Sequence, residues 1–275
     1  MSNFRRDSDG FQIVKTKRLS KNKQTKIPTK QTNFETQEVI IDFEKSTRRI
    51  QTAVEELRNS KYTEDALKSV SNVISSRKVV EIVCFGLGHI SECHISRHQL
   101  AFLLCMKDYC DPIKVLVHDP IFYQGECDIL KHFNIEVIEQ NIEGNYVISD
   151  RDITLLYFPH CPKQLTNNFL WTNWGLKLSN CVLICNSFNA LIESQPSRLL
   201  SETVTYIYKI FPFTSEIVLE NNFKYTDIFN DTSIHWFPKE KLDTVNEDLW
   251  KKIDKPTYDN TEEFITSQMV EKLKL

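Results

Sequence analysis

Short apolar runs rich in β-branched residues alternate with stretches of helical spacing from residue 79 onward. We predict strands from the five apolar runs at residues 79–85, 114–118, 135–139, 153–158 and 181–185. Helices are predicted after them, at about residues 91–108, 124–133, 164–174 and from 196 to 200 or beyond. Such alternation is typical of a Rossmann-like three-layer α/β fold with a mostly parallel sheet.

Two further parts of the pattern extend this core. Apolar residues recur at helical spacing through 38–76, with a break near Asn59, which predicts two N-terminal helices packed on the sheet. Late strands are predicted at 216–219 and 233–237, whereas 204–210 fits a helix or a strand equally well. The division we expect is a disordered basic arm at 1–33, N-terminal helices at 34–78, the α/β domain at 79–238, and a charged tail at 239–275 with a short helix near 262–273.

The charge is distributed unevenly along the chain. Residues 1–33 carry a formal charge of +7 and the remainder −10, which gives the net −3. A mildly acidic globular part is not expected to bind duplex DNA directly. The basic stretch at 15–23 fits a solvated tail or a nuclear address. No run approaches the ~18 apolar residues of a membrane helix, and no apolar secretory segment opens the chain. We therefore expect a cytoplasmic protein without membrane contact, and a nuclear location stays open.

Polar and special residues gather where the predicted strands end. They are Gly86 and Gly88 after the first strand, Asp119 after the second, His160 and Cys161 after the fourth, and Asn186 and Ser187 after the fifth. In a sheet ordered 3-2-1-4-5 these four ends lie along one edge, where open parallel sheets bind their ligands. The sequence therefore predicts a polar cleft there, with Ser91 capping the helix that follows the glycine turn.

The glycine turn permits two interpretations. Gly86 and Gly88 supply two thirds of G-x-G-x-x-G, with Ser91 at the third glycine position. Asp119 is placed like an acid that holds a ribose, although it lies 31 residues past Gly88 instead of ~20. It also opens Asp-Pro-Ile-Phe-Tyr, which is similar to the D-P-P-Y loop of amino-methyltransferases except at Ile121. One interpretation is a nucleotide- or S-adenosylmethionine-dependent transferase, and the other is a turn that only packs.

Metal and haem chemistry have weaker support. The eight cysteines include no C-x-x-C and no zinc spacing, and His94 and His98 supply only two ligands of the three or four that zinc needs, so we expect no metal site. Cys161-Pro162 is a minimal haem-contact pattern. Arg97 lies close enough to the glycine turn to pair with an anion. The segment 229–238 fits either a loop that closes the site or a structural corner.

Seven separated segments resemble, in order, the sensitivity-to-red-light-reduced (SRR-like) family. They are Cys84-Phe-Gly-Leu-Gly88, Cys93 with Arg97-x-Gln-Leu-Ala-Phe102, Asp119-Pro-x-Phe122, His160-Cys161, Asn167-Asn-x-Leu-Trp-x-Asn-Trp174, Asn186-Ser-Phe188 and Phe229-Asn-Asp-Thr-Ser-x-His-Trp-Phe-Pro238. The match spans about residues 79 to 238, and Pro162 stands where the family has glycine, which weighs against haem ligation by Cys161 as a family trait.

The resemblance implies a regulator with no established reaction. It implies a role in circadian clock input and light responses, and in the control of haem biosynthesis and clock-gene expression. It also implies unidentified regulatory protein partners, and it leaves a small-molecule ligand and the identity of any cofactor open. The candidate cleft residues that match its motifs are Gly86, Gly88, Arg97, Gln99, Asp119, His160, Cys161, Asn186, Ser187, Asn230, Asp231 and His235.

Overall fold

The computed structural model describes residues 39–251, 254–258, 265–267 and 269. The arm predicted at 1–33 and most of the helix predicted near 262–273 lie outside these residues. Across the described part runs a seven-stranded sheet in the order β3-β2-β1-β4-β5-β7-β6. Its first five strands are parallel, and β7 runs antiparallel to both β5 and β6. The order 3-2-1-4-5, on which the prediction of a cleft depends, is therefore present, and the two late strands extend it.

The strands begin and end close to the predicted positions. Their bounds are β1 Val79–Phe85, β2 Lys114–His118, β3 Glu136–Val137, β4 Ile153–Tyr157, β5 Cys181–Asn186, β6 Ser215–Val218 and β7 Thr232–Trp236. The α-helices are α1 Phe43–Arg58, α2 Lys61–Ile74, α3 His94–Cys110, α4 Gln124–His132, α5 Lys163–Thr172, α6 Phe188–Ser194, α7 Ser197–Thr203, α8 Thr205–Ile210 and α9 Lys239–Leu242. Three short 3₁₀ turns lie at Leu176–Asn180, Phe211–Phe213 and Glu247–Trp250.

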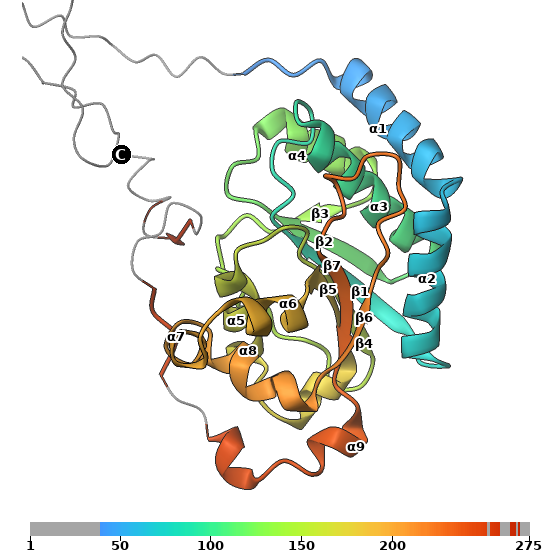
Figure 1. Cartoon of the computed structure of the whole chain (residues 1–275). Helices are drawn as coiled ribbons and strands as arrows, with labels where there is room; N and C mark the ends of the chain where they lie inside the picture. Colours follow the sequence, from blue (N-terminus) through green and yellow to red (C-terminus); the bar gives the residue numbers. More distant parts are fainter. Residues whose placement is uncertain (1–38, 252–253, 259–264, 268, 270–275) are drawn as a thin grey trace, which may run out of the picture. The chain divides into compact units, whose positions relative to one another are not determined.

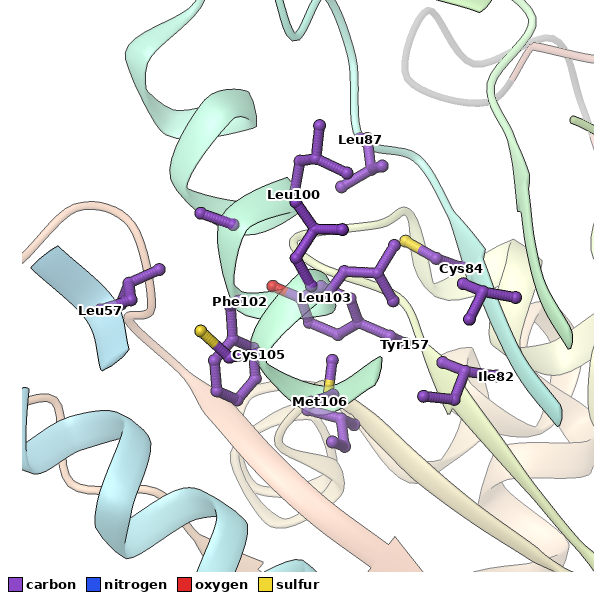
Figure 2. Close-up of a cluster of buried hydrophobic side chains, with 14 of the residues drawn as sticks. Leu57, Ile82, Cys84, Leu87, Leu100, Phe102, Leu103, Cys105, Met106 and Tyr157 are labelled. Carbon is purple, nitrogen blue, oxygen red and sulfur yellow. The ribbon is translucent and has the colours of Figure 1, made fainter. Parts of the chain in front are cut away.

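The helices cover both faces of the sheet, as the fold class predicts. The first apolar layer joins α1, α2 and α3 to one face, and the second joins α5, α7 and α8 to the other. Figure 1 shows α1 and α2 on the outer side of α3, away from α5 and α8. In Figure 2 the side chains of α3, among them Leu103 and Met106, lie toward Ile82 and Cys84 of β1 and Tyr157 of β4. The sheet is therefore buried on both sides, which explains the nearly continuous apolar runs of its central strands.

Two local predictions need correction. Ser91 does not cap α3, because the helix begins at His94 after Cys93, and the Ser91 hydroxyl donates to Glu126 instead. Helix α6 was missed, since its seven residues follow Ser187 with too short an apolar pattern. The ambiguous stretch at 204–210 is resolved as helix α8.

The described part of the C-terminal tail is fastened to the loop before β4 and to α5. The Glu143 carboxylate accepts hydrogen bonds from Lys255 Nζ at 2.9 Å and from the Ser267 amide at 2.8 Å. Tyr258 Oη lies 2.8 Å from Asn167 Nδ2 and 2.9 Å from Asn168 Oδ1. Both asparagines are about 1% exposed. The asparagine-rich motif on α5 thus serves packing, because it satisfies buried polar groups of the loops around it.

Candidate functional site

A cavity of about 770 Å³ lies at the carboxyl ends of β4 and β5. Five of the twelve predicted cleft residues line it, namely His160, Cys161, Asn186, Ser187 and Asp231. The remaining lining comes mainly from the first turns of α5 and from α6. This volume falls in the range of ~300–1,000 Å³ that is usual for small-molecule sites. The cavity lies at the edge of the sheet that the strand-end argument selects, but on its β4–β5 side.

Two residues with unusual backbone conformations meet at the rim of this cavity. His160 has φ of 50° and Asp231 has φ of 54°, both in the left-handed region that non-glycine residues rarely adopt. The loops are tied together, since the His160 Nε2 lies 3.1 Å from the Asn230 carbonyl and the Ser187 amide donates to the Asp231 carbonyl at 3.1 Å. Such conformations cost free energy and tend to occur at functional sites.

A buried carboxylate, Glu216 on β6, fixes the turn between β5 and α6. It accepts from Ser187 Oγ at 2.6 Å and from the Asn189 amide at 3.0 Å, and it lies 3.5 Å from His235 Nε2. Burial by itself would raise the pKa of Glu216, but the hydrogen bonds that its carboxylate accepts from Ser187 and Asn189 outweigh burial and lower this pKa below its usual range. Only a charged residue at the edge of a late apolar run indicates this role in the sequence.

His235 is fully buried and belongs to the structural support of the cavity. The Phe188 amide donates to its Nε2 at 3.2 Å, so the ring proton sits on Nδ1, which lies 3.5 Å from Cys185 Sγ. An Nδ1 that already carries a proton cannot accept one from Cys185, and burial raises the pKa of this thiol well above its usual range. The pair is therefore not a resting nucleophile and base. In segment 229–238 Asp231 reaches the cavity, whereas His235 forms the structural corner.

The glycine turn after β1 is occupied by the protein's own groups. Gly86 and Gly88 have φ of 76° and 70°, and a Cβ added at Gly86 would lie 2.4 Å from Cys161 Sγ. That thiol donates to the Phe85 carbonyl at 3.1 Å, and burial raises its pKa. A protonated, hydrogen-bonded thiol does not favour the haem-thiolate interpretation. The Asp119 carboxylate accepts from the Gly88 amide at 2.7 Å, so it too is used within the protein.

Glu126, which the sequence prediction missed, joins the loops after β1 and β2. This fully buried carboxylate accepts from the amide and hydroxyl of Ser91 at 2.8 and 2.7 Å and from the Tyr123 amide at 3.1 Å. It also lies 3.1 Å from His89 Nδ1, and the His89 ring stacks on Tyr123 with centroids 4.0 Å apart. The spacing from Tyr123 to Glu126 is that of a capping box. This spacing was the one feature of the sequence that could have indicated a structural role for Glu126.

The other predicted cleft residues do not line the cavity. Arg97 Nη2 donates to the Ser91 carbonyl at 3.2 Å, and Gln99 Nε2 donates to the Ile228 carbonyl at 3.3 Å, both from α3. The seven predicted residues outside the cavity lining are Gly86, Gly88, Arg97, Gln99, Asp119, Asn230 and His235. Within the described ranges, no cluster of three or more metal-ligating side chains is present, and no helix has the length and apolarity needed to cross a membrane.

Comparisons with known proteins give a consistent family. A family model described as the SRR1 domain matches residues 50–236. An SRR1-like protein of Drosophila melanogaster is 30% identical over 229 residues, which cover 82% of this chain and 80% of that protein. An SRR1-like protein of Mus musculus is 38% identical over 139 residues, covering 50% of this chain and 55% of the relative. The Arabidopsis thaliana protein named SENSITIVITY TO RED LIGHT REDUCED 1 is 29% identical over 172 residues, covering 60% and 61%.

Solved structures are similar only at a distance. A dimethyladenosine transferase of Plasmodium falciparum aligns with a TM-score of 0.38 and 14% identity, covering 67% of this chain and 65% of that one. The 23S rRNA methyltransferase ErmE aligns with a TM-score of 0.37 and 10% identity, covering 63% and 68%. At these scores the likeness supports no conclusion about function.

Proposed function

This chain belongs to the SRR1 domain family, and we propose that it is a regulatory protein whose interaction with protein partners depends on a small polar molecule bound in the β4–β5 cavity. The observation that supports the ligand is the cavity itself. It has the volume of a small-molecule site, and residues from the ends of two parallel strands converge on it with the strained His160 and Asp231 at its rim.

The proposed output of this regulator is circadian clock input and control of haem biosynthesis and clock-gene expression. The resemblance of the seven sequence segments supports this output, as does the red-light response in the name of the Arabidopsis relative. Deletion of the gene in its own organism tests it, with the period of a clock-controlled transcript and the total haem content as the two readouts. A deletion strain in which both readouts equal those of the parent would show that this output is wrong.

Ligand binding is tested by thermal unfolding of the full chain with S-adenosylmethionine, NAD(P), nucleotides and haem. A compound present at 100 times its dissociation constant adds ~2.7 kcal/mol of stability. We expect the shift to be lost in Asp231→Asn, which removes a charge from the cavity rim, and to persist in Asp227→Asn, an exposed aspartate that is not among the lining residues. Binding that is insensitive to Asp231→Asn would place the ligand elsewhere.

A nucleotide- or S-adenosylmethionine-dependent transferase is the second candidate. The glycine turn with two positive φ angles, next to an aspartate that closes the neighbouring parallel strand, favours it. Two contacts weigh against a transferase. The Gly88 amide donates to Asp119, and Cys161 lies beside Gly86, so a ligand at this turn would have to displace both the hydrogen bond and the thiol. A thermal shift by one of these cofactors that Asp119→Ala abolishes would favour the transferase.

A further inference from the structure

We infer that the ligand of the β4–β5 cavity carries an anionic group, a carboxylate or a phosphate, that binds at Lys163. This inference rests on the proposed function and adds the chemical class of the ligand. It depends on three features of the cavity: a lysine without an acidic partner, a carboxylate that is held apart from it, and an apolar wall.

Lys163, the first residue of α5, is half-buried in the cavity lining. Its Nζ lies 2.7 Å from the neutral amide oxygen of Gln195, and no carboxylate among the described residues forms an ion pair with it. Lys224 and Lys255, by contrast, are paired with carboxylates, Lys224 with Glu56 at 3.0 Å and Lys255 with Glu143 at 2.9 Å. Lys107 is also bonded only to neutral oxygens, the carbonyls of Phe133 and Asn134, but it lies outside the lining of this cavity. A half-buried ammonium with only a neutral partner is incompletely compensated, so an anion in the cavity gains a charge-assisted hydrogen bond from it.

The same end of α5 adds to the positive potential. The residue before the helix is Pro162, which supplies no side-chain cap to the first turn. The partial positive charge of the helix N-terminus therefore lies at the Lys163 side of the cavity without a side-chain cap, although the Pro162 carbonyl accepts from the Leu165 amide. On its own this would not define a site, and here it acts in the same direction as the lysine.

The Asp231 carboxylate determines which chemical group is expected at the other end of the ligand. It is the carboxylate among the lining residues, whereas the Lys163 Nζ is bonded to the Gln195 amide oxygen. Opposite charges held apart in one cavity favour a ligand with an anionic group at one end and a hydrogen-bond donor, a hydroxyl or an amine, at the other. Phe188, Leu191 and Ile207 line the cavity as well and provide contact for an apolar middle. A second anionic group would meet Asp231 and be repelled.

The experiment measures binding to the full chain by calorimetry, with pairs of probes that differ in one anionic group. Suitable pairs are adenosine 5′-monophosphate with adenosine, glucose 6-phosphate with glucose, and indole-3-acetate with indole-3-acetamide. We expect the anionic member of at least one pair to bind about 10–100-fold more tightly than its neutral partner, as one charged hydrogen bond allows. Lys163→Gln should remove this preference, Lys163→Arg should keep it, and Lys209→Gln on α8, outside the cavity lining, should leave it unchanged.

The outcomes separate this inference from the proposed function. The inference of an anionic ligand is overturned if neutral and anionic probes bind the wild-type chain equally well. It is also overturned if the preference for the anion survives in Lys163→Gln. In both cases the proposal that the cavity binds a ligand still stands. If neither these probes nor S-adenosylmethionine, NAD(P), nucleotides or haem bind, both proposals fail. The urea midpoint of each variant confirms that it is folded before binding is measured, and Lys163→Arg decides the matter if Lys163→Gln does not fold.

Discussion

Replacement of Gly86 by alanine should destabilise the fold through two separable costs. The φ of 76° puts an alanine in the left-handed region, which costs about 1–2 kcal/mol. The new methyl group would lie 2.4 Å from Cys161 Sγ, and relief of an overpacked contact in a core typically costs about 1–3 kcal/mol. The free energy of unfolding should therefore fall by about 2–5 kcal/mol, a large part of the stability of a domain.

A double-mutant cycle isolates the contact. Cys161→Ala removes the sulfur and leaves its Cβ 3.9 Å from the added methyl, an ordinary contact distance. The double variant should therefore be about 1–3 kcal/mol more stable than the sum of the single costs predicts. Gly175→Ala is the control for strain alone, because its φ is 138° and no atom lies within 4 Å of the added Cβ.

Urea unfolding followed by tryptophan fluorescence gives these free energies, with the slope checked for each variant. If the Gly86→Ala and Cys161→Ala costs simply add, the sulfur does not fill the glycine turn. The packing explanation of that turn would then be refuted, and a ligand role for the turn would regain support.

Two other carboxylates and the tail give three further predictions. Glu126→Ala should lower the unfolding free energy by roughly 3 kcal/mol, because it leaves the buried Ser91 amide and the partly buried Tyr123 amide unpaired. Glu136→Ala on the exposed edge should change the unfolding free energy little, and equal losses in the two variants would contradict the loop-joining role of Glu126. Hydrogen bonds lower the pKa of Glu216 from 4.5, so its contribution to stability is complete above pH 4.5 and is lost as the pH falls through the lowered pKa. Glu216→Gln should therefore flatten the acid end of the curve of urea midpoint against pH, and an unchanged curve would show that Glu216 makes no such contribution. Tyr258→Phe should speed proteolytic cleavage of the tail, because its bond to Asn168 is lost, and an unchanged cleavage rate would show that this bond does not hold the tail.

The sequence predicts the central strands of the sheet well because these strands are buried on both faces. Val79–Phe85 and Ile153–Tyr157 read as continuous apolar runs for this reason. Helix ends are less predictable, since they depend on which hydrogen-bond partner a polar side chain reaches. Ser91 is a residue type that commonly caps helices, but Glu126 in the first turn of α4 accepts its hydrogen bond instead, and no local pattern reveals a competitor 35 residues away.

For the candidate site, the sequence determined the edge of the sheet but not the position along it. Parallel strands bring all their carboxyl ends to one edge, so the motif residues after β1, β2, β4 and β5 had to lie there. Which of these ends is open depends on side chains from distant segments. Cys161 fills the turn at Gly86 and the Gly88 amide engages Asp119, so the β1–β2 side is closed, while the space beyond Ser187 stays open as a cavity. The positions of the strands follow from local burial and periodicity, whereas the filling of a cleft is a matter of volume and hydrogen-bond partners that only the tertiary structure decides.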